Sequence, residues 1–165
     1  MRGLIKWQAR LPTFKTCGKS SGDPLSLIDT SVYITVLRDE VFAREFRPRY
    51  FRDIPRTHFS SVVIQELLAG ARTLRHQRQA AALYESFERA GRIVIPSHTV
   101  WKDTGNVVAA IAEQTPQFRD KLSRGLLNDV LIALSGRSID ATVVTRNGED
   151  FRLIQQCKTF ALEVV

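Results

Sequence analysis

Short apolar runs alternate along the chain with longer segments in which apolar residues recur every three or four positions. Runs of the first kind are typical of buried strands, and segments of the second kind are typical of amphipathic helices. The runs predict strands at residues 25–28, 92–96, 141–145 and 160–165. The periodic segments predict helices beginning near 32 and 60, and over 71–90, 99–114, 117–124, 126–135 and 150–156. Residues 38–59 are dense in charge and contain two prolines, which predicts a loop with some helix.

Strands that alternate with helices indicate a mainly parallel sheet with helices on both faces. We therefore expect one domain over residues 25–165, an α/β/α sandwich of three layers whose central sheet has four to five short strands. In such sheets ligands bind outside the carboxyl ends of the strands. We therefore expect catalytic or ligand-binding residues at the carboxyl ends of the predicted strands.

The first 24 residues differ from the rest of the chain. Residues 1–22 contain five basic side chains and no acid, and Gly22 and Pro24 mark the junction with the first predicted strand. We expect residues 1–24 to form a basic arm, or an extension that precedes the domain.

Composition limits the possible classes of protein. Hydrophobic residues make up 44% and charged residues 25%, which is ordinary for a globular domain, and no apolar run reaches the roughly 20 residues of a membrane span. The formal net charge of +7 suits an acidic partner such as nucleic acid, or serves solubility alone. Cys17 and Cys157 have neither a metal-binding spacing nor a disulfide framework, so we expect a reduced, cytoplasmic protein without a membrane partner.

Four acidic residues are candidates for a functional site at the carboxyl ends of the strands. Asp29 directly follows the first predicted strand, and Asp150 follows the strand at 141–145. Glu66 lies in an otherwise apolar helix, and Asp129 interrupts an apolar segment. Each has a structural alternative, because aspartate is a favoured helix cap and a glutamate can lie on a solvated helix edge.

Carboxylates crowded within a few Å repel one another unless a cation lies between them. Hard oxygen ligands suit Mg²⁺ or Mn²⁺, and a Mg²⁺ site uses few carboxylates and keeps waters beside a substrate phosphate. The pattern therefore predicts metal-assisted hydrolysis of a phosphodiester bond. The three histidines show no zinc-type spacing, and the chain has no glycine-rich phosphate-binding loop.

Four short motifs together resemble those of the PIN-domain nucleases, and they occur in the family's order. They are Asp29-Thr30-Ser31, the segment Ser61–Gly70 around Glu66, the segment Asn128–Ala133 around Asp129, and the segment Thr145–Phe151 around Asp150. The sequence departs from the family where Ser31 replaces a frequent asparagine, and its basic arm is longer than usual. Within the family, the chain is most similar to the VapC-type ribonuclease toxins of bacterial toxin–antitoxin pairs.

This resemblance implies a Mg²⁺- or Mn²⁺-dependent endoribonuclease that forms a homodimer, cleaves RNA and is inhibited by a small antitoxin protein covering its acidic site. The implied catalytic and metal-ligating residues are Asp29, Glu66, Asp129 and Asp150, and the implied supporting residues are Thr30, Thr145 and Asn147. Asp29 and Asp129 are the best candidate ligands, whereas Glu66 and Asp150 complete the set or orient the attacking water. The alternative is a non-catalytic RNA-binding or adaptor protein with the same fold.

Two clusters of arginines accompany the acidic residues. Arg72, Arg75 and Arg78 recur at helical spacing and form either a track for the RNA backbone or a solvated face. The second cluster, between residues 44 and 56, is interleaved with aromatic residues, which either stack on bases or cover a protein interface.

Overall fold

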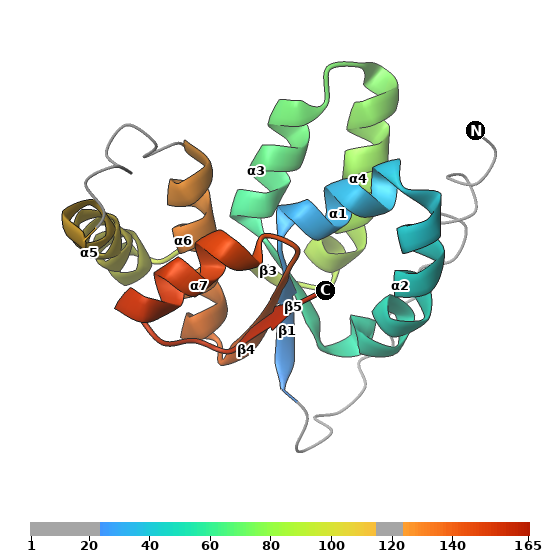
Figure 1. Ribbon diagram of the computed structural model, residues 1–165. Helices are drawn as coiled ribbons and strands as arrows, with labels where there is room; N and C mark the ends of the chain where they lie inside the picture. The colour runs from blue at the N-terminus through green and yellow to red at the C-terminus, as the bar shows by residue number, and fades with distance from the viewer. Residues whose placement is uncertain (1–23, 115–123) are drawn as a thin grey trace.

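The computed structural model describes residues 24–114 and 124–165 (Figure 1). Its strands are β1 (Leu25–Ile28), β2 (Thr57–Ser60), β3 (Ile93–Val94), β4 (Ala141–Thr145) and β5 (Leu162–Val164). Its helices are α1 (Thr30–Arg38), α2 (Glu40–Asp53), the short 3-10 helix η2 (Ile54–Arg56), α3 (Ser61–Gly70), α4 (Leu74–Arg89), α5 (His98–Gln114), α6 (Arg124–Ser138) and α7 (Gly148–Cys157). The expected arm at 1–24 and the helix expected at 117–124 lie outside the described residues except for the last residue of each.

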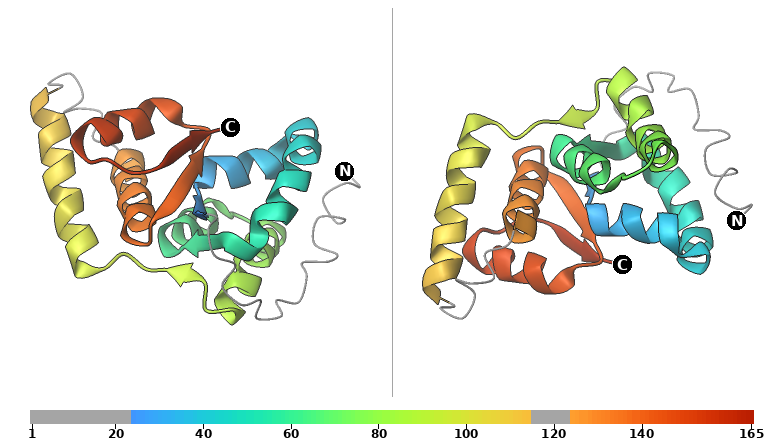
Figure 2. Two further views of the ribbon diagram at one scale, coloured as in Figure 1. Left: turned by 90° about the horizontal axis from the view of Figure 1, so that it is seen from below. Right: turned by 90° about the horizontal axis from the view of Figure 1, so that it is seen from above.

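The five strands form one parallel sheet in the order β3-β2-β1-β4-β5. Helices α1 to α4 lie on one face of this sheet and α5 to α7 on the other, which gives three layers (Figures 1 and 2). From β1 the chain proceeds outward to β2 and β3, and then returns to place β4 on the other side of β1. The expected α/β/α sandwich is thus confirmed, and its strand order reverses between β1 and β4.

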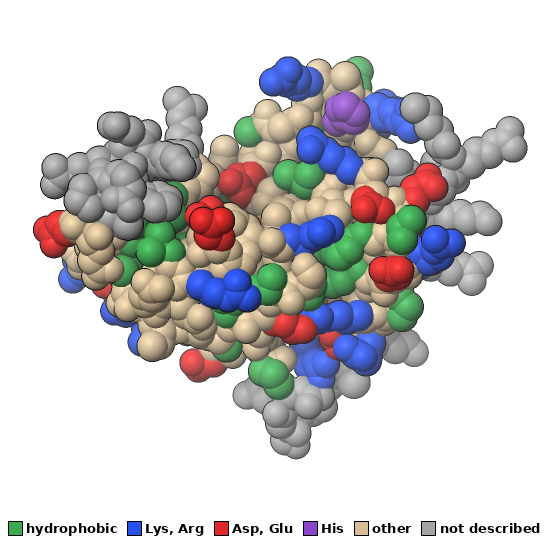
Figure 3. Space-filling view, in the orientation of Figure 1, with side chains coloured by type: hydrophobic (Ala, Val, Ile, Leu, Met, Phe, Trp, Pro, Cys, Tyr) green, Lys and Arg blue, Asp and Glu red, His purple; other side chains and the backbone are tan. Residues whose placement is uncertain are grey.

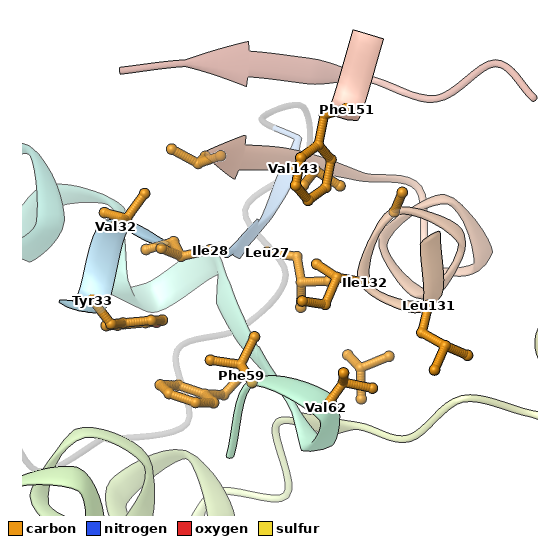
Figure 4. Close-up of a cluster of buried hydrophobic side chains, with 14 of the residues drawn as sticks. Leu27, Ile28, Val32, Tyr33, Phe59, Val62, Leu131, Ile132, Val143 and Phe151 are labelled. Atoms are coloured by element: carbon orange, nitrogen blue, oxygen red, sulfur yellow. The ribbon is translucent and has the colours of Figure 1, made fainter. Parts of the chain in front are cut away.

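The core is built on the alternation of side chains along the central strands. Leu27 of β1 points toward α6, where Ile132 lies, whereas its neighbour Ile28 points to the opposite face (Figure 4). On that opposite face the ring of Tyr33 in α1 stacks on Phe59 of β2, with ring centroids 4.7 Å apart. Both faces of the sheet are therefore covered, which explains why strands such as β4 read as largely apolar runs.

Residues 38–59 were expected to form a loop with some helix, and the structure corrects the balance, because most of this segment is the helix α2. Its buried residues Ala43, Phe46 and Tyr50 are three and four positions apart, which is helical spacing. The signal was obscured by the many charged residues on the exposed face and by Pro48, whose side chain is exposed within the helix.

The same segment ends in β2, a central strand that the sequence pattern did not predict. Two of its four residues are the polar Thr57 and Ser60, and both side chains are fully buried. Each side chain has a local partner: the Thr57 hydroxyl donates to the Asp53 carbonyl at 2.9 Å, and the Ser60 hydroxyl accepts from the Val62 N–H at 3.1 Å. These hydrogen bonds let a polar sequence occupy the interior of the sheet.

Helix α4 begins three residues later than expected, because the Thr73 hydroxyl accepts from the His76 N–H and caps the helix there. Its end agrees with expectation: Gly91 has φ +65° and terminates the helix in the left-handed conformation that glycine favours. Strands β3 and β5 are shorter than expected.

Helix α6 approaches the sheet closely at Gly136. A Cβ atom at this position would lie 2.6 Å from a methyl group of Val143 in β4, so only glycine fits without displacement. This contact fixes the distance between β4 and the helix that carries Asp129. Within residues 24–114 and 124–165 no helix is long and apolar enough to cross a membrane.

Candidate metal centre

Asp29 lies where β1 and β4 end side by side in the middle of the sheet. Its backbone N–H donates to the Val144 carbonyl at 2.9 Å, which extends the pairing of the two strands by one residue. The Asp29 residue is only 2% exposed, and the Thr145 hydroxyl donates to its Oδ2 at 2.8 Å. Since the strand order reverses at this point, Asp29 occupies the position at which open α/β sheets bind ligands.

Ser31 completes the environment of Asp29. Both its backbone N–H, at 3.2 Å, and its hydroxyl, at 2.6 Å, donate to Oδ2 of Asp29. Asp29 therefore caps α1, so the structural alternative considered for this residue is correct and coexists with a place in the site. In the described part of the chain all hydrogen bonds to this carboxylate converge on Oδ2, which leaves Oδ1 for a ligand.

Glu66 lies on α3, across from the start of α1, and is held by two donors. The Thr30 hydroxyl donates to its Oε2, and the Asn128 side-chain amide donates to its Oε1 at 2.9 Å. Because Thr30 follows Asp29 and Asn128 precedes Asp129, these two hydrogen bonds connect α3 to the other candidate acids.

Asp129 and Asp150 share one donor. The side-chain amide of Asn147 donates to Oδ2 of Asp129 at 3.1 Å and to Oδ2 of Asp150 at 2.7 Å. The backbone N–H of Asn147 donates to the Thr145 hydroxyl at 2.9 Å, so this bridge is anchored to the partner of Asp29. Asp129 lies in the second turn of α6, which excludes the helix-capping alternative for this residue.

Three other carboxylates lie close enough to Asp129 to affect its ionisation. The pKa of Asp129 is raised from 3.8 to about 8, first by burial and then by the negative charges of Asp29, Asp150 and Glu66, whereas the hydrogen bond from Asn147 opposes this rise. Repulsion of this kind is expected where several acids face one small volume.

The structure thus brings together all seven residues that the sequence indicated and adds Ser31 and Asn128. The position of Ser31, two residues after Asp29, is the spacing at which a capping aspartate accepts hydrogen bonds. Asn128 is the first residue of the motif around Asp129, but nothing in the sequence gives its side chain a separate role. The sequence position of Ser31 or Asn128 does not by itself distinguish a helix cap from a site residue. The distinction depends on contacts between distant parts of the chain.

Within the described residues, no three His, Cys, Asp or Glu side chains already form a group arranged to hold a metal ion. Amides and hydroxyls separate the acids instead, as with Asn147 between Asp129 and Asp150. The donor set still fits a hard divalent cation, because Mg²⁺ is usually bound through one or two carboxylates and several waters. A cation bound there would offset the repulsion around Asp129.

The arginine cluster between residues 44 and 56 is largely structural. Arg49 donates to both carboxylate oxygens of Glu163 at 2.6 and 2.5 Å, and Asp53 pairs with both Arg52 and Arg56. The interleaved Phe46 is buried, so it cannot stack on bases. By contrast, the expected stripe of Arg72, Arg75 and Arg78 on and just before α4 is exposed. Figure 3 shows basic side chains spread over one face of the molecule with acidic ones among them.

A cavity of about 220 Å³ adjoins Glu66, between α1 and the hairpin of α3 and α4. Its apolar lining includes Ile34, Leu37 and Leu67, and its polar lining includes Arg38 and His76. The cavity therefore offers an apolar surface next to one of the four acids.

The raised pKa of Asp129 predicts how stability changes with pH in metal-free buffer. Between the ordinary value of 3.8 and about 8, the folded protein holds a proton that the unfolded chain has lost, so stability falls as pH rises through this window. We expect the Tm of the wild type to fall by at least about 2–4 °C more than that of Asp129→Asn over the window, which corresponds to about 1 kcal/mol for a chain of this size. Thermal unfolding followed by circular dichroism measures this difference, and parallel profiles for the two proteins would contradict it.

The fold and the site together define a class: a parallel α/β sandwich with four carboxylates at the point where its strand order reverses. The family model for the PIN domain matches residues 26–155, which is most of the chain. The chain belongs to the PIN domain family.

Solved structures with a similar fold were found, whereas a search of curated proteins gave no match. A chain of DNA-bound VapBC from Salmonella typhimurium is 22% identical, with a TM-score of 0.62 over 86% of this chain and 98% of that one. A chain of FitAB bound to the IR36 DNA fragment is 20% identical, with a TM-score of 0.57 over 85% and 94%. A chain of VapBC2 from Rickettsia felis bound to a promoter DNA fragment is 19% identical, with a TM-score of 0.54 over 86% and 98%. At these identities the likeness establishes the fold.

Proposed function

We propose that this chain is a Mg²⁺- or Mn²⁺-dependent endoribonuclease that acts in the cytoplasm as the toxin of a VapC-type toxin–antitoxin pair. The observation that carries the proposal is the convergence of negative charge on Asp129, whose pKa is raised by burial and by Asp29, Asp150 and Glu66. Membership of the PIN domain family, whose members are generally nucleases, supports it. The fold neighbours VapBC and FitAB support a function as one member of a toxin–antitoxin pair.

Asp29 and Asp129 are the residues that we expect to hold the ion. Asp29 presents Oδ1, while its Oδ2 is held by Ser31 and Thr145, and Asp129 lies at the centre of the acidic charge. When bound, a hard divalent ion lowers the pKa of a water ligand and offsets negative charge on the scissile phosphate. Glu66 and Asp150 would complete the ligand set, or one of them would orient the attacking water and accept its proton as general base.

The polar residues of the site hold the carboxylates without neutralising them. Asn147, Asn128 and Thr30 donate through neutral amides and a hydroxyl, so they bring no positive charge that would compete with a cation. An arginine or lysine at these positions would fix the acids equally well but would cancel the charge. These residues therefore act as the outer groups that orient ligands in metal sites.

The proposed antitoxin covers the acidic site, and the cavity beside Glu66 is the place where we expect it to dock. The apolar Ile34, Leu37 and Leu67 offer a surface for the side chains of a partner helix. An occupant of this cavity would lie against Glu66 and so block access to the site.

We further propose that the chain forms a homodimer. Ile95 is 73% and Trp101 is 53% exposed, and both lie near the junction of β3 and α5, where α5 begins at His98. Large apolar side chains that are exposed within one short stretch of the chain mark a candidate interface. A second copy of the chain would bury them.

The test of the proposed function is an RNA cleavage assay with the purified chain in Mg²⁺ or Mn²⁺, alone and after mixing with the product of the adjacent gene. We expect internal cleavage of RNA by the chain alone and loss of cleavage in the mixture. RNA that is bound but left intact with both metals would instead support the non-catalytic RNA-binding or adaptor protein.

A further inference from the structure

Arg146 is an exposed cation directly after β4, between Thr145 and Asn147 of the site. Its backbone N–H donates to the Ser31 hydroxyl at 3.0 Å, and that hydroxyl donates to Asp29 at 2.6 Å. The main chain of Arg146 is therefore fixed relative to the most deeply buried acid of the site.

The guanidinium of Arg146 is held by an aromatic ring. It lies 4.6 Å from the ring centroid of Phe42 in α2, and the Phe42 ring stacks on the buried Phe46 at 5.4 Å with an interplanar angle of 12°. A cation–π contact of this kind orients a guanidinium and leaves its positive charge intact.

Arg146 differs in its ion pairing from Arg49 and Arg52 of the neighbouring helix α2. Arg49 and Arg52 are paired with carboxylates, whereas no carboxylate forms an ion pair with Arg146 in residues 24–114 and 124–165. Arg146 is therefore an oriented cation with unused hydrogen-bond donors at the rim of an acidic site.

We propose that Arg146 binds a non-bridging phosphate oxygen of the RNA backbone, and that the Phe42 ring positions its guanidinium for this contact. This inference rests on the proposed function and adds a substrate-binding site to it. A cluster of four acids repels a polyanion, so a fixed cation at its rim is needed to bring a phosphate close. Arginine suits this role because its planar head group donates two hydrogen bonds to phosphate oxygens.

The test is the binding of a fluorescently labelled RNA to the full chain in excess chelator, at several salt concentrations, so that affinity is measured without cleavage. We expect Arg146→Gln to weaken binding about tenfold, because a hydrogen bond to a charged group is lost. The slope of log K against log salt should fall in magnitude by about 0.7, the value for one phosphate contact on a single strand.

Two further variants separate charge from orientation. Arg146→Lys should keep the wild-type salt slope but lose part of the affinity, because lysine keeps the charge and lacks the planar pair of donors. Phe42→Leu should do the same, because it keeps Arg146 and removes the ring that orients it. A merely structural role for Arg146 would change the Tm and leave the salt slope unaltered.

Arg89→Gln is the matched control. Arg89 ends α4 just before β3, which lies three strands away from β4 in the sheet. We expect the Arg89→Gln variant to bind RNA like the wild type. If Arg146→Gln matched Arg89→Gln in both affinity and salt slope, the role of Arg146 would be overturned while the nuclease proposal stood. If the wild type bound no RNA at low salt and cleaved none with metal, the nuclease proposal itself would fail, and this inference with it.

Discussion

The Asp29→Asn variant is expected to cleave RNA more than about 100-fold more slowly than the wild type in saturating Mg²⁺ or Mn²⁺. Loss of a group that merely orients a metal ligand already costs about 10–100-fold, and Asp29 is proposed as a ligand itself. The substitution removes the negative charge at Oδ1 and adds an N–H₂ group that cannot bind a cation. Initial rates on a labelled RNA measure the effect.

The fold of this variant should be retained. All three hydrogen bonds to Asp29 converge on Oδ2, so the amide oxygen of asparagine can take that position and accept from Ser31 and Thr145. Asp140→Asn is the matched control, because Asp140 directly precedes β4, at the end of this strand opposite to the site. The φ of Asp140 is 53°, which asparagine tolerates. Equal cleavage rates for Asp29→Asn and the wild type would remove Asp29 from the mechanism.

Removal of divalent metal is expected to abolish RNA cleavage by the wild type. Excess chelator leaves four carboxylates facing one volume with no cation to offset their charge, and it removes the ion that activates water. Addition of Mg²⁺ or Mn²⁺ beyond the chelator should restore the rate. The control is the same chelator saturated with Mg²⁺ before it is added, which should have no effect.

A second measurement makes the same test without RNA. An ion that binds only the folded state stabilises it by about 2.7 kcal/mol when present at 100 times its Kd. The Tm of the wild type should therefore rise with added Mg²⁺ or Mn²⁺, and that of Asp29→Asn should rise less. Cleavage at the full rate in excess chelator would rule out the metal mechanism.

The sequence predicted those parts of the fold in which an apolar pattern and a burial pattern coincide. The strands β1 and β4 are largely apolar runs bounded by a polar residue, so the strands could be located together with the site residues Asp29, directly after β1, and Thr145, the last residue of β4. Strand β2 could not be located, because its buried Thr57 and Ser60 are satisfied by hydrogen bonds that only the folded chain forms.

The candidate site shows the same division. The four acids could be identified because charge in an apolar segment is conspicuous, and the family resemblance indicated Thr30, Thr145 and Asn147. The partners Ser31 and Asn128 could not be identified, because serine and asparagine are common anywhere on a surface. Asn128 meets Glu66 across 62 positions of the sequence, and Ser31 meets the backbone of Arg146 across 115. Contacts of this range depend on the order of the strands, which no local pattern encodes.

The position of β4 in the sheet has a consequence for the synthesis of this protein. Asp29 emerges early from the ribosome, but its partner Thr145 lies 116 residues later, and only then can β4 pair with β1. A nascent chain that has not yet released β4 and α7 lacks Asn147 and Asp150 as well. The proposed site can therefore be complete only after β4 and the first turn of α7 have been translated.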